Sequence, residues 1–568
     1  MKNKWLKWKI AAIAVGVITF SATFAGAQEQ RVQKKLIASG WDQPDTATLR
    51  KNLSLMEQSP FDGVVVDVKG MDEQGTARKT FYAFSTFEWK KEWFQSSIDD
   101  LKAIHSNKLT DNFVLVGNFP GNVDFFDDAG WKQVADHWRI AAEIAKEGNL
   151  KGILFDTEPY GGQQFNYPWQ KNKFKTQHTL TEYQAKARQR GREIMQAIAA
   201  VDPNLVILTY WMDSSNIDAA TSTNPQAALQ LAVDGLLPSF INGWLDVIPP
   251  TMTLVDGNEH AYHYNSEMDY LKSANEMRNT ALNMVPPEDR AKYIAQVQPS
   301  FGFYLDGYIV PSTSPWYIDS EGSPPTLRLH QNVSLALNAA AEYVWIYGEH
   351  CRWWPTDNKS VTEKTWEEAL PGIDDALLSI THPDQLAEQK IAALEKSGQL
   401  VDLLKNGNFS EAGKTKEGIA TDTSANWGLW QGKKSQGTAT LDRTVNYGEG
   451  DKGSLQLAGV SDGAVLQSVP VAEGGIYAIQ GWIRKTNRQE EQAAVSVRVS
   501  IGGTVAVLVP DVDSAAKDGW QKVQAVVVAP AKANKLNIAL GRKTRGQTTA
   551  NDMTWFDDFH IYKIGQIG

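Results

Sequence analysis

The sequence contains almost no cysteine. Cys351 is the only one among 568 residues, so no disulfide can form within the chain. Small secreted domains often depend on disulfides, whereas this chain must be stabilised by ordinary hydrophobic cores. Cys351 follows His350, but catalytic partners meet in space rather than along the chain, so this adjacency does not indicate a nucleophile pair. We therefore expect Cys351 to be dispensable for catalysis.

Positive charge is also scarce. The chain has 56 Lys and Arg against 66 Asp and Glu, a formal net charge of −10. This balance argues against nucleic acid and anionic surfaces as partners. No glycine-rich nucleotide loop follows the first predicted strand, which argues against a doubly wound nucleotide-binding sheet.

Residues 1–27 have the pattern of a signal peptide. Four lysines among the first nine residues precede an apolar segment, and Ala25-Gly26-Ala27 fits the small-residue cleavage site before Gln28. The apolar segment is too short to span a bilayer comfortably. Removing the four lysines, with no acids in the same segment, changes the net charge from −10 to −14. We expect an exported protein, periplasmic or extracellular, with no stable membrane insertion after cleavage.

Residues 28–383 alternate short apolar runs with amphipathic segments. The helical patterns are clearest at 45–58, 130–146, 181–200, 267–280 and 329–341. Eight strand–helix alternations predict a (β/α)8 barrel as the catalytic domain, because each strand and the following helix form one crossover unit. The eight predicted strands are 35–39, 63–68, 113–117, 152–155, 205–209, 245–248, 293–297 and 343–346.

The composition and the pattern of apolar residues change after the predicted barrel. Residues 384–405 have apolar positions at helical spacing and predict a helical linker. Residues 406–568 are glycine-rich with short alternating strands, which predicts a β-sandwich. Its predicted strands are 453–457, 464–469, 477–484, 494–501, 505–509, 521–527, 535–540 and 555–561.

The decapeptide 151–160, Lys-Gly-Ile-Leu-Phe-Asp-Thr-Glu-Pro-Tyr, is the most informative stretch. A short apolar run, as in a buried parallel strand, is followed by Asp156 and Glu158. Residues two apart on a strand share a face, so both carboxylates are predicted to lie together at its carboxyl end. Barrel enzymes place catalytic groups at this end of their strands, and hydrolysis of a glycosidic bond uses paired carboxylic acids.

Other acids and aromatic residues follow the remaining predicted strands. Together they predict a funnel that supplies proton donors, negative charge and stacking faces for sugar rings. The candidate catalytic residues are Glu158, Asp156, Glu349, Tyr210, Asp213 and Asp67. The candidate substrate-binding residues of the barrel are Asp42, Asn118, Tyr160, Trp211, Trp345, Tyr347, Arg352 and Trp353.

The decapeptide resembles the fourth-strand pattern of family 18 chitinases and their relatives. Asp156 and Glu158 match its Asp-x-Glu, and Leu154 stands where the pattern has an outer aspartate. The resemblance implies a barrel glycoside hydrolase in which Glu158 is the general acid, Asp156 orients a substrate acetamido group and Tyr210 bonds to it. In a two-carboxylate mechanism, Glu349, Asp213 or Asp67 would instead be the nucleophile or base.

The final domain resembles the jelly-roll carbohydrate-binding modules of bacterial polysaccharide-degrading enzymes. The matching segments include 406–409, 475–484 and 555–561. The resemblance implies sugar binding, with Trp427 and Trp430 as the expected platforms and Trp482 and Trp555 in the core. It also implies a structural calcium held by Asp558 and carbonyls near Asn408.

A catalytic metal is not expected. Within Glu259-His260-Ala261-Tyr262-His263 the two histidines lack a third ligand at convincing spacing. We expect a cofactor-free glycoside hydrolase acting on a polysaccharide or oligosaccharide. The alternative is a non-catalytic carbohydrate-binding or surface protein that uses the barrel as a scaffold.

Overall fold

The computed structural model describes residues 33–448, 453–485, 493–508, 519–544 and 548–568. The predicted signal peptide and its cleavage site lie outside these residues. No helix in the described part of the chain is long and apolar enough to cross a membrane.

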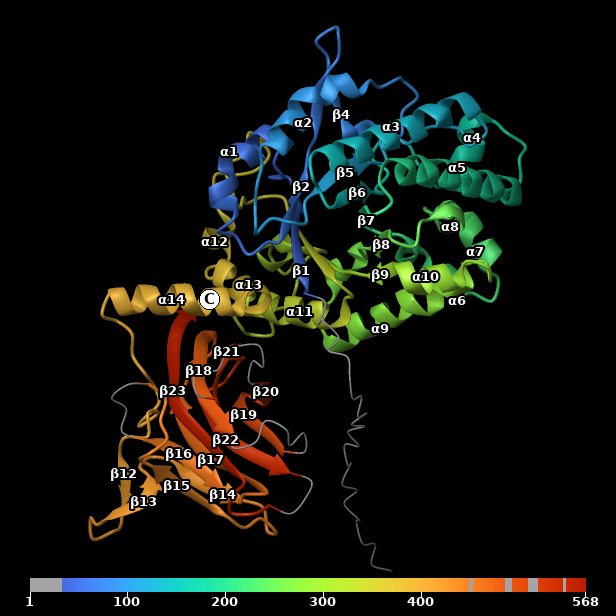
Figure 1. Cartoon of the computed structure of the whole chain (residues 1–568). Helices are drawn as coiled ribbons and strands as arrows, with labels where there is room; N and C mark the ends of the chain where they lie inside the picture. The colour runs from blue at the N-terminus through green and yellow to red at the C-terminus, as the bar shows by residue number, and fades with distance from the viewer. Residues whose placement is uncertain (1–32, 449–452, 486–492, 509–518, 545–547) are drawn as a thin grey trace, which may run out of the picture. The chain divides into compact units, whose positions relative to one another are not determined.

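A nine-stranded parallel sheet organises the N-terminal part of the chain (Figure 1), in the order β10-β11-β1-β2-β5-β6-β7-β8-β9. A small hairpin of β3 (Lys69–Met71) and β4 (Ala77–Lys79) follows β2. The sheet strands are β1 (Lys35–Gly40), β2 (Gly63–Val66), β5 (Phe113–Gly117), β6 (Gly152–Asp156), β7 (Val206–Thr209), β8 (Thr253–Asp256), β9 (Val297–Pro299), β10 (Gly302–Tyr304) and β11 (Tyr343–Gly348).

Helices connect these strands and lie outside the sheet (Figure 1). Several begin at strong local signals: Thr179 and Glu182 form a capping box at the start of α5, and Ser266 and Asp269 form one at α9. The α-helices are α1 (Thr46–Met56), α2 (Gln95–Lys102), α3 (Asp128–Glu147), α4 (Tyr167–Phe174), α5 (Leu180–Val201), α6 (Ile217–Thr221), α7 (Pro225–Leu231), α8 (Leu237–Val247), α9 (Glu267–Arg278), α10 (Arg290–Gln296), α11 (Pro325–Ala339), α12 (Trp366–Ala369), α13 (Ile373–Thr381) and α14 (Pro383–Lys396). The 3-10 turns are η1 (Thr80–Tyr82), η2 (Lys91–Phe94), η3 (Asp213–Asn216), η4 (Glu259–His263), η5 (Thr280–Asn283) and η6 (Leu305–Tyr308).

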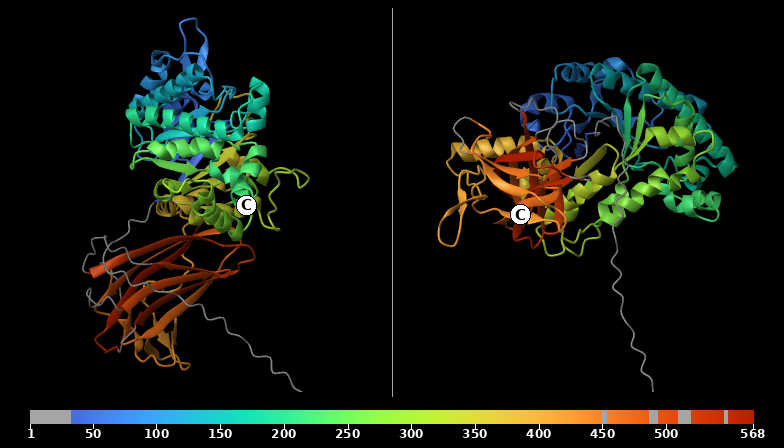
Figure 2. Two further views of the ribbon diagram at one scale, coloured as in Figure 1. Left: turned by 90° about the vertical axis from the view of Figure 1, so that its right-hand side faces the viewer. Right: turned by 60° about the horizontal axis from the view of Figure 1, so that its bottom comes forward.

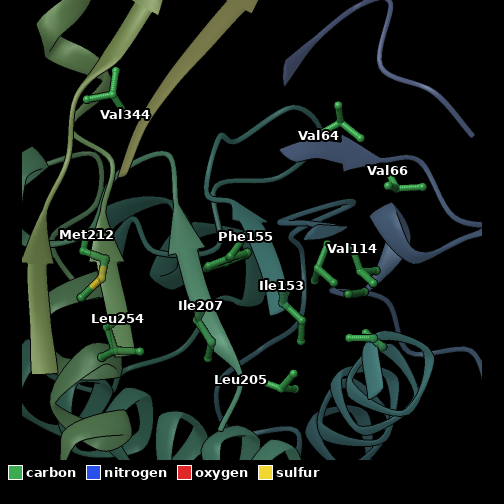
Figure 3. Close-up of a cluster of buried hydrophobic side chains, with 14 of the residues drawn as sticks. Val64, Val66, Val114, Ile153, Phe155, Leu205, Ile207, Met212, Leu254 and Val344 are labelled. Atoms are coloured by element: carbon green, nitrogen blue, oxygen red, sulfur yellow. The ribbon is translucent and has the colours of Figure 1, made fainter. Parts of the chain in front are cut away.

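Both faces of the parallel sheet are buried. Along β6, Ile153 and Phe155 belong to the large core shared with the helices, whereas Leu154 belongs to a second cluster made by the strands themselves. Figure 3 shows the first of these sets, including Val64, Val114, Ile153 and Ile207. The period of two along each strand explains why these strands are continuous apolar runs in the sequence.

The two edge strands of this sheet are consecutive in the chain. Only Ser300 and Phe301 separate β9, which pairs with β8, from β10, which pairs with β11. Across the break, the Ser300 N–H donates to the Asp256 carbonyl at 2.9 Å, and the Trp345 N–H donates to the Phe301 carbonyl at 3.1 Å. The segment 297–304 therefore lies between β8 and β11.

Two strand predictions were wrong. Residues 245–248 end helix α8, whose Phe240, Ile241, Trp244 and Leu245 are all buried at helical spacing, and the strand is β8, eight residues later. Residues 293–297 lie mostly in helix α10, and β9 begins only at Val297. In both cases an apolar segment of a buried helix looks like a short buried strand, because periodicity cannot separate the two over so few residues.

Two five-stranded antiparallel sheets form most of the C-terminal region (Figure 2, orange to red). Their orders are β14-β17-β22-β19-β20 and β15-β16-β23-β18-β21, and β12 pairs with β13 separately. All eight strands predicted here are present, although Val509 lies outside the described residues. The strands are β12 (Ala412–Lys414), β13 (Ala420–Ser424), β14 (Gly428–Gln431), β15 (Thr438–Asp442), β16 (Ser454–Ala458), β17 (Asp462–Pro470), β18 (Gly475–Lys485), β19 (Ala493–Ile501), β20 (Thr504–Leu508), β21 (Trp520–Val528), β22 (Lys535–Thr544) and β23 (Met553–Gln566).

The predicted helical linker is helical only in its first part. Helix α14 ends at Lys396, and the chain then runs beside β23, where the Leu403 N–H donates to the Ile561 carbonyl at 2.9 Å. Leu404 is buried in the core of the antiparallel sheets. The last residues of the linker thus belong structurally to the region that follows, while the predicted domain boundaries remain predictions.

Candidate active site

Strand β6 ends at Asp156, whose side chain organises the turn that follows. Its Oδ1 accepts the backbone N–H of Glu158 at 2.9 Å, and its Oδ2 accepts the Tyr160 hydroxyl at 3.0 Å. An aspartate that accepts the N–H two residues further on forms an Asx turn. Glu158 therefore lies in a turn just beyond the strand, and the pleat of β6 does not position it.

Three glutamates line a cavity of about 210 Å³ beside this turn. Glu158 follows β6, Glu259 begins η4 just after β8, and Glu349 follows β11. Each acid thus comes from the carboxyl end of a different parallel strand, the edge at which such sheets carry their sites. Among the described residues that line the cavity there is no Lys, Arg or His.

Aromatic rings make up most of the remaining wall. The rings of Tyr262 and Tyr304 are stacked with centroids 5.5 Å apart, and Trp316 lies edge-on to Tyr304 at 5.4 Å. The Tyr304 hydroxyl donates to Glu349 Oε2 at 3.1 Å. Trp316 is 43% exposed and His263 stacks on it at 5.0 Å, so this ring forms an accessible side of the cavity.

Burial and the proximity of other acids favour protonation of Asp156, Glu259 and Glu349. Burial, with the neighbouring Glu158 and Asp156 carboxylates, raises the pKa of Glu259 to about 8. Burial also raises the pKa of Asp156 to about 7, with Glu158 contributing and the hydrogen bonds to Asp156 opposing the shift. The pKa of Glu349 is raised by burial, and the charges of Asp306 and Glu158 act in the same direction. Carboxyls of this kind can donate a proton near neutral pH.

A second cavity of about 520 Å³ adjoins the first. Tyr160, Tyr210 and Tyr347 line both cavities, so the two share a wall at the end of β6. Asp156 and Asp67 are among the residues that line the larger cavity. Asp67 accepts from Lys79 at 2.9 Å, and Lys69 lies 3.7 Å away, so this predicted catalytic carboxylate is neutralised by cations.

Tyr210, predicted to contact substrate, is buried at this shared wall. Its hydroxyl lies 2.6 Å from Ser39 Oγ, and its ring stacks on Trp345 at 4.5 Å. Trp345 is fully buried and donates from Nε1 to the Gly257 carbonyl at 2.9 Å. Trp345 is therefore a core residue beneath the cavities, and Tyr347 is the ring of β11 that reaches them.

Asp213 is not among the residues that line either cavity. It lies in η3 and is buried, and neither of its carboxylate oxygens has a hydrogen-bond partner among the described residues. Burial, together with nearby Asp256, raises its pKa well above the usual range. Burial therefore favours the protonated form of this carboxyl, which lies outside the candidate site.

Asp42 and Trp353 hold two loops together. Asp42 is buried, burial raises its pKa to about 7, and its Oδ2 accepts the Trp353 N–H at 2.7 Å. The Trp353 ring packs edge-on against Phe61, with centroids 4.8 Å apart. Neither residue lines the two cavities, although Trp41 beside Asp42 lines the larger one.

The other predicted binding residues of this region have structural partners. Asn118 is buried, and its Nδ2 donates to the Thr157 carbonyl at 3.1 Å, which supports the turn after β6. Trp211 donates to Asp234 Oδ2 at 2.9 Å and lines a separate cavity of about 510 Å³. Arg352 pairs with Glu363 at 2.5 Å and does not contact Glu349 in the described hydrogen bonds.

The two tryptophans predicted as sugar platforms differ from each other. Trp427 is half-buried, its Nε1 donates to the Asn406 carbonyl at 3.1 Å, and its ring contacts Phe409 in the core. Trp430 is 53% exposed and lines a groove of about 400 Å³ with Leu466 and Arg498. The structure therefore leaves Trp430, but not Trp427, free to stack on a ligand. Trp555 is buried as expected, whereas Trp482 is half-buried against Tyr447 at 3.9 Å.

The residues around Asp558 do not fit the predicted calcium site. Asp558 Oδ1 accepts from His560 Nε2 at 2.9 Å, and Asn408 Oδ1 accepts the Ser410 N–H at 3.3 Å. The Gly407 carbonyl accepts the Phe559 N–H at 3.1 Å. One Asp558 oxygen and the Gly407 carbonyl are thus already hydrogen-bond acceptors, and His560, which lies between Asp558 and Asp402, is not a ligand that Ca²⁺ prefers. In the described part of the chain, no group of three or more His, Cys, Asp or Glu could hold a metal ion.

Sequence reasoning missed Glu259, Tyr262 and Trp316 as cavity residues. Glu259 was considered only within a histidine motif, because the strand before it was placed eight residues too early. The run 253–256, followed by Gly257-Asn258, contained the signal of a strand end and a turn. Trp316 lies in a loop with no regular pattern around it, so only the folded chain brings it to the cavity.

No family model and no curated protein matches the chain. Among solved structures, an Anoxybacillus alpha-amylase is similar over 90% of this chain and 98% of its own, at 10% identity and a TM-score of 0.33. TmCBM61 in complex with beta-1,4-galactotriose covers 29% of this chain and 99% of its own, at 15% identity and a TM-score of 0.21. The CBM22-1 xylan-binding domain of Paenibacillus barcinonensis Xyn10C covers 29% and 96%, at 18% identity and a TM-score of 0.20. With TM-scores this low, these likenesses carry no argument about this chain.

Proposed function

We propose that this protein is an exported glycoside hydrolase that cleaves a polysaccharide by carboxylate acid/base catalysis. One observation carries the proposal: Glu158, Glu259 and Glu349, from the ends of three parallel strands, surround one cavity whose other walls are aromatic rings. Carboxyl groups supply the acid and the nucleophile or base of glycoside hydrolysis, and the rings supply stacking faces for sugars.

The proposal includes a closed (β/α)8 barrel. The segment containing β9 and β10 bonds to β8 on one side and to β11 on the other, which supports a ring of eight strands if β9 and β10 are counted as one interrupted strand. In such a barrel the three glutamates lie at the catalytic face.

Of the two mechanisms, the two-carboxylate route has more support from the contacts. Glu158 would protonate the leaving-group oxygen, and Glu349 or Glu259 would act as nucleophile or as base toward water. The substrate-assisted route needs Asp156 and Tyr210 to hold an acetamido group, yet Asp156 already accepts two hydrogen bonds and the Tyr210 hydroxyl pairs with Ser39. The anomeric form of the first product, followed by NMR, would distinguish retention from inversion.

The experiment that tests the function is a hydrolysis screen. The protein from Gln28 onward is incubated with a panel of polysaccharides, and release of reducing ends is measured beside the Glu158→Gln variant. Hydrolysis of at least one polysaccharide by the parent, and not by the variant, is the expected result. Sugar binding without any hydrolysis across the panel would instead favour a non-catalytic carbohydrate-binding protein.

A further inference from the structure

The cavity that contains the three glutamates has an unusual charge balance for a sugar site. Glu158, Glu259 and Glu349 all line it, and no Lys, Arg or His among the described residues lines it with them. A neutral sugar would leave this group of acids without a counter-charge, and an anionic sugar would be disfavoured. The lining of the cavity therefore has no positive charge, and a positively charged ligand would supply one.

The aromatic walls favour the same ligand chemistry. Tyr262, Tyr304 and Trp316 present rings within 5.4–6.4 Å of one another around the cavity. Ring faces arranged in this way attract an ammonium group through their quadrupoles, and the attraction is greater where water is excluded. Carboxylates and aromatic faces together are the two kinds of group that recognise an organic cation.

The side chain of Tyr262 also lines the cavity. Tyr262 is 8% exposed as a residue, and its hydroxyl is not among the buried polar atoms of the described residues that lack a partner. A tyrosine hydroxyl can donate or accept a hydrogen bond, so it offers a contact to a ligand in the cavity. A sugar hydroxyl next to an amine would make this contact.

We infer that this cavity binds a protonated amine, and that the substrate class is a polysaccharide of amino sugars whose amine is free rather than acetylated. The substrate assignment rests on the proposed hydrolase function, whereas amine binding stands on the cavity alone. The excess of acids over bases in the whole chain would also attract a cationic polymer.

Proton linkage supplies an additional readout. With the cavity empty, burial and the neighbouring Glu158 and Asp156 carboxylates raise the pKa of Glu259 to about 8. The titratable groups that line this cavity from the other elements are Glu158, Glu349, Tyr160, Tyr210, Tyr304 and Tyr347, and Tyr262 lies on the same element as Glu259. A bound ammonium lowers the pKa of Glu259, so binding at neutral pH releases a proton.

Isothermal titration with monosaccharides tests the inference without requiring turnover. Glucosamine, glucose and N-acetylglucosamine are titrated into the full mature protein in two buffers of different ionisation enthalpy. We expect glucosamine to bind about tenfold or more tightly than the two neutral sugars, with proton release and with weakening by salt. Equal affinity for all three sugars would overturn the inference.

Matched variants locate the effect. Glu259→Gln should remove most of the preference for glucosamine, while Glu388→Gln, the same change at an exposed position of α14, should keep it. A Glu259→Gln protein of unchanged melting temperature that still prefers the amine would also overturn the inference. If the protein binds the amine but does not hydrolyse chitosan, only the proposed hydrolase function is rejected. If it hydrolyses neutral polymers and shows no preference for the amine, only the amine-binding inference is rejected.

Discussion

Two groups of carboxylates lie at the same edge of the parallel sheet and differ in their partners. Asp45 and Asp67 bond to Lys69 and Lys79 at 2.9 Å each, within the lining of the larger cavity. Glu158, Glu259 and Glu349 line the smaller cavity, and no Lys, Arg or His is among the described residues that line it with them. The two groups share the fold that positions them and differ in whether a cation neutralises them.

The difference separates structural from functional acids. Burial alone would raise the pKa of Asp45, but hydrogen bonds from Thr48 and Lys69 lower it, so Asp45 is a stable anion. Glu259 has no such donors, and its pKa is raised. Keeping unpaired acids together costs stability, and such groups with shifted pKa values cluster where catalysis or binding uses them.

The largest effect is expected from Glu158→Gln. This variant keeps the shape of the side chain and removes the proton donor, so turnover should fall by about 10²–10⁴-fold. Substrate binding and the melting temperature should change little, because the backbone N–H of residue 158 still donates to Asp156. Reducing-end assays on the substrate found in the screen measure the loss. Wild-type turnover by Glu158→Gln would show that the end of β6 is not catalytic.

The next effect distinguishes the partners of Glu158. If Glu349 is the nucleophile or base, Glu349→Gln should abolish turnover. Glu349→Ala should also abolish it, and in a retaining enzyme azide should rescue the Ala variant, because the shortened side chain leaves room for azide where the carboxylate was. The melting temperature should fall only slightly, because the change affects at most one hydrogen bond, which the Tyr304 hydroxyl donates to Glu349. A loss of only a few-fold would point to Glu259 or to a substrate-assisted route. Glu259→Gln separates these two: it should abolish activity if Glu259 is the nucleophile or base, and should cost far less in a substrate-assisted route.

Most of the strands and part of the candidate site could be predicted from the sequence. Strand β6 and its two acids follow from a short apolar run that ends in Asp-Thr-Glu, and Glu349 follows from the end of the last strand. The antiparallel strands were predictable because alternating residues and glycine-rich turns mark each one locally.

The rest depends on contacts between distant segments. Nothing local distinguishes Asp67, which Lys79 neutralises, from Glu349, whose carboxylate accepts a hydrogen bond from the Tyr304 hydroxyl. Trp427 and Trp430 are three residues apart in similar surroundings, yet only Trp427 packs on Phe409. Glu259 was missed because a buried helix was mistaken for the preceding strand. Which acids are paired with cations and which rings are buried depends on the folded chain, and the pattern of apolar residues in the sequence does not predict it.

A smaller effect concerns Asp213, an unpaired acid that lies outside both cavities. Burial raises the pKa of Asp213 in the folded state above its pKa in the unfolded state. The protonated side chain therefore contributes stability that is fully present below the unfolded-state pKa. This stability is lost as the pH rises through the folded-state pKa. Asp213→Asn removes this dependence. We expect the stability of the parent to fall relative to the variant by up to about 1.4 kcal/mol per pH unit above about pH 4, until Asp213 ionises in the folded state.

Denaturant unfolding at several pH values measures this effect. The exposed Asp422→Asn in β13 is the matched control and should leave the pH dependence of the parent unchanged. Turnover by Asp213→Asn should stay near that of the parent, because Asp213 lines neither cavity. A difference in unfolding free energy that is independent of pH would contradict the protonated, buried state.

The smallest effect is expected where the acids are paired. Lys79→Met removes one partner of Asp67, whose second partner, Lys69, remains 3.7 Å away. Lys79 is more than one-third exposed, and ion pairs of this kind contribute only about 0–1 kcal/mol to stability. We therefore expect a loss of unfolding free energy below about 1 kcal/mol, and turnover close to that of the parent. Denaturant unfolding and the reducing-end assay measure the two quantities. A loss of turnover as large as that of Glu158→Gln would mean that Asp67 and its lysines act on the substrate, and the distinction between paired and unpaired acids would then not separate structural from functional residues at this edge of the sheet.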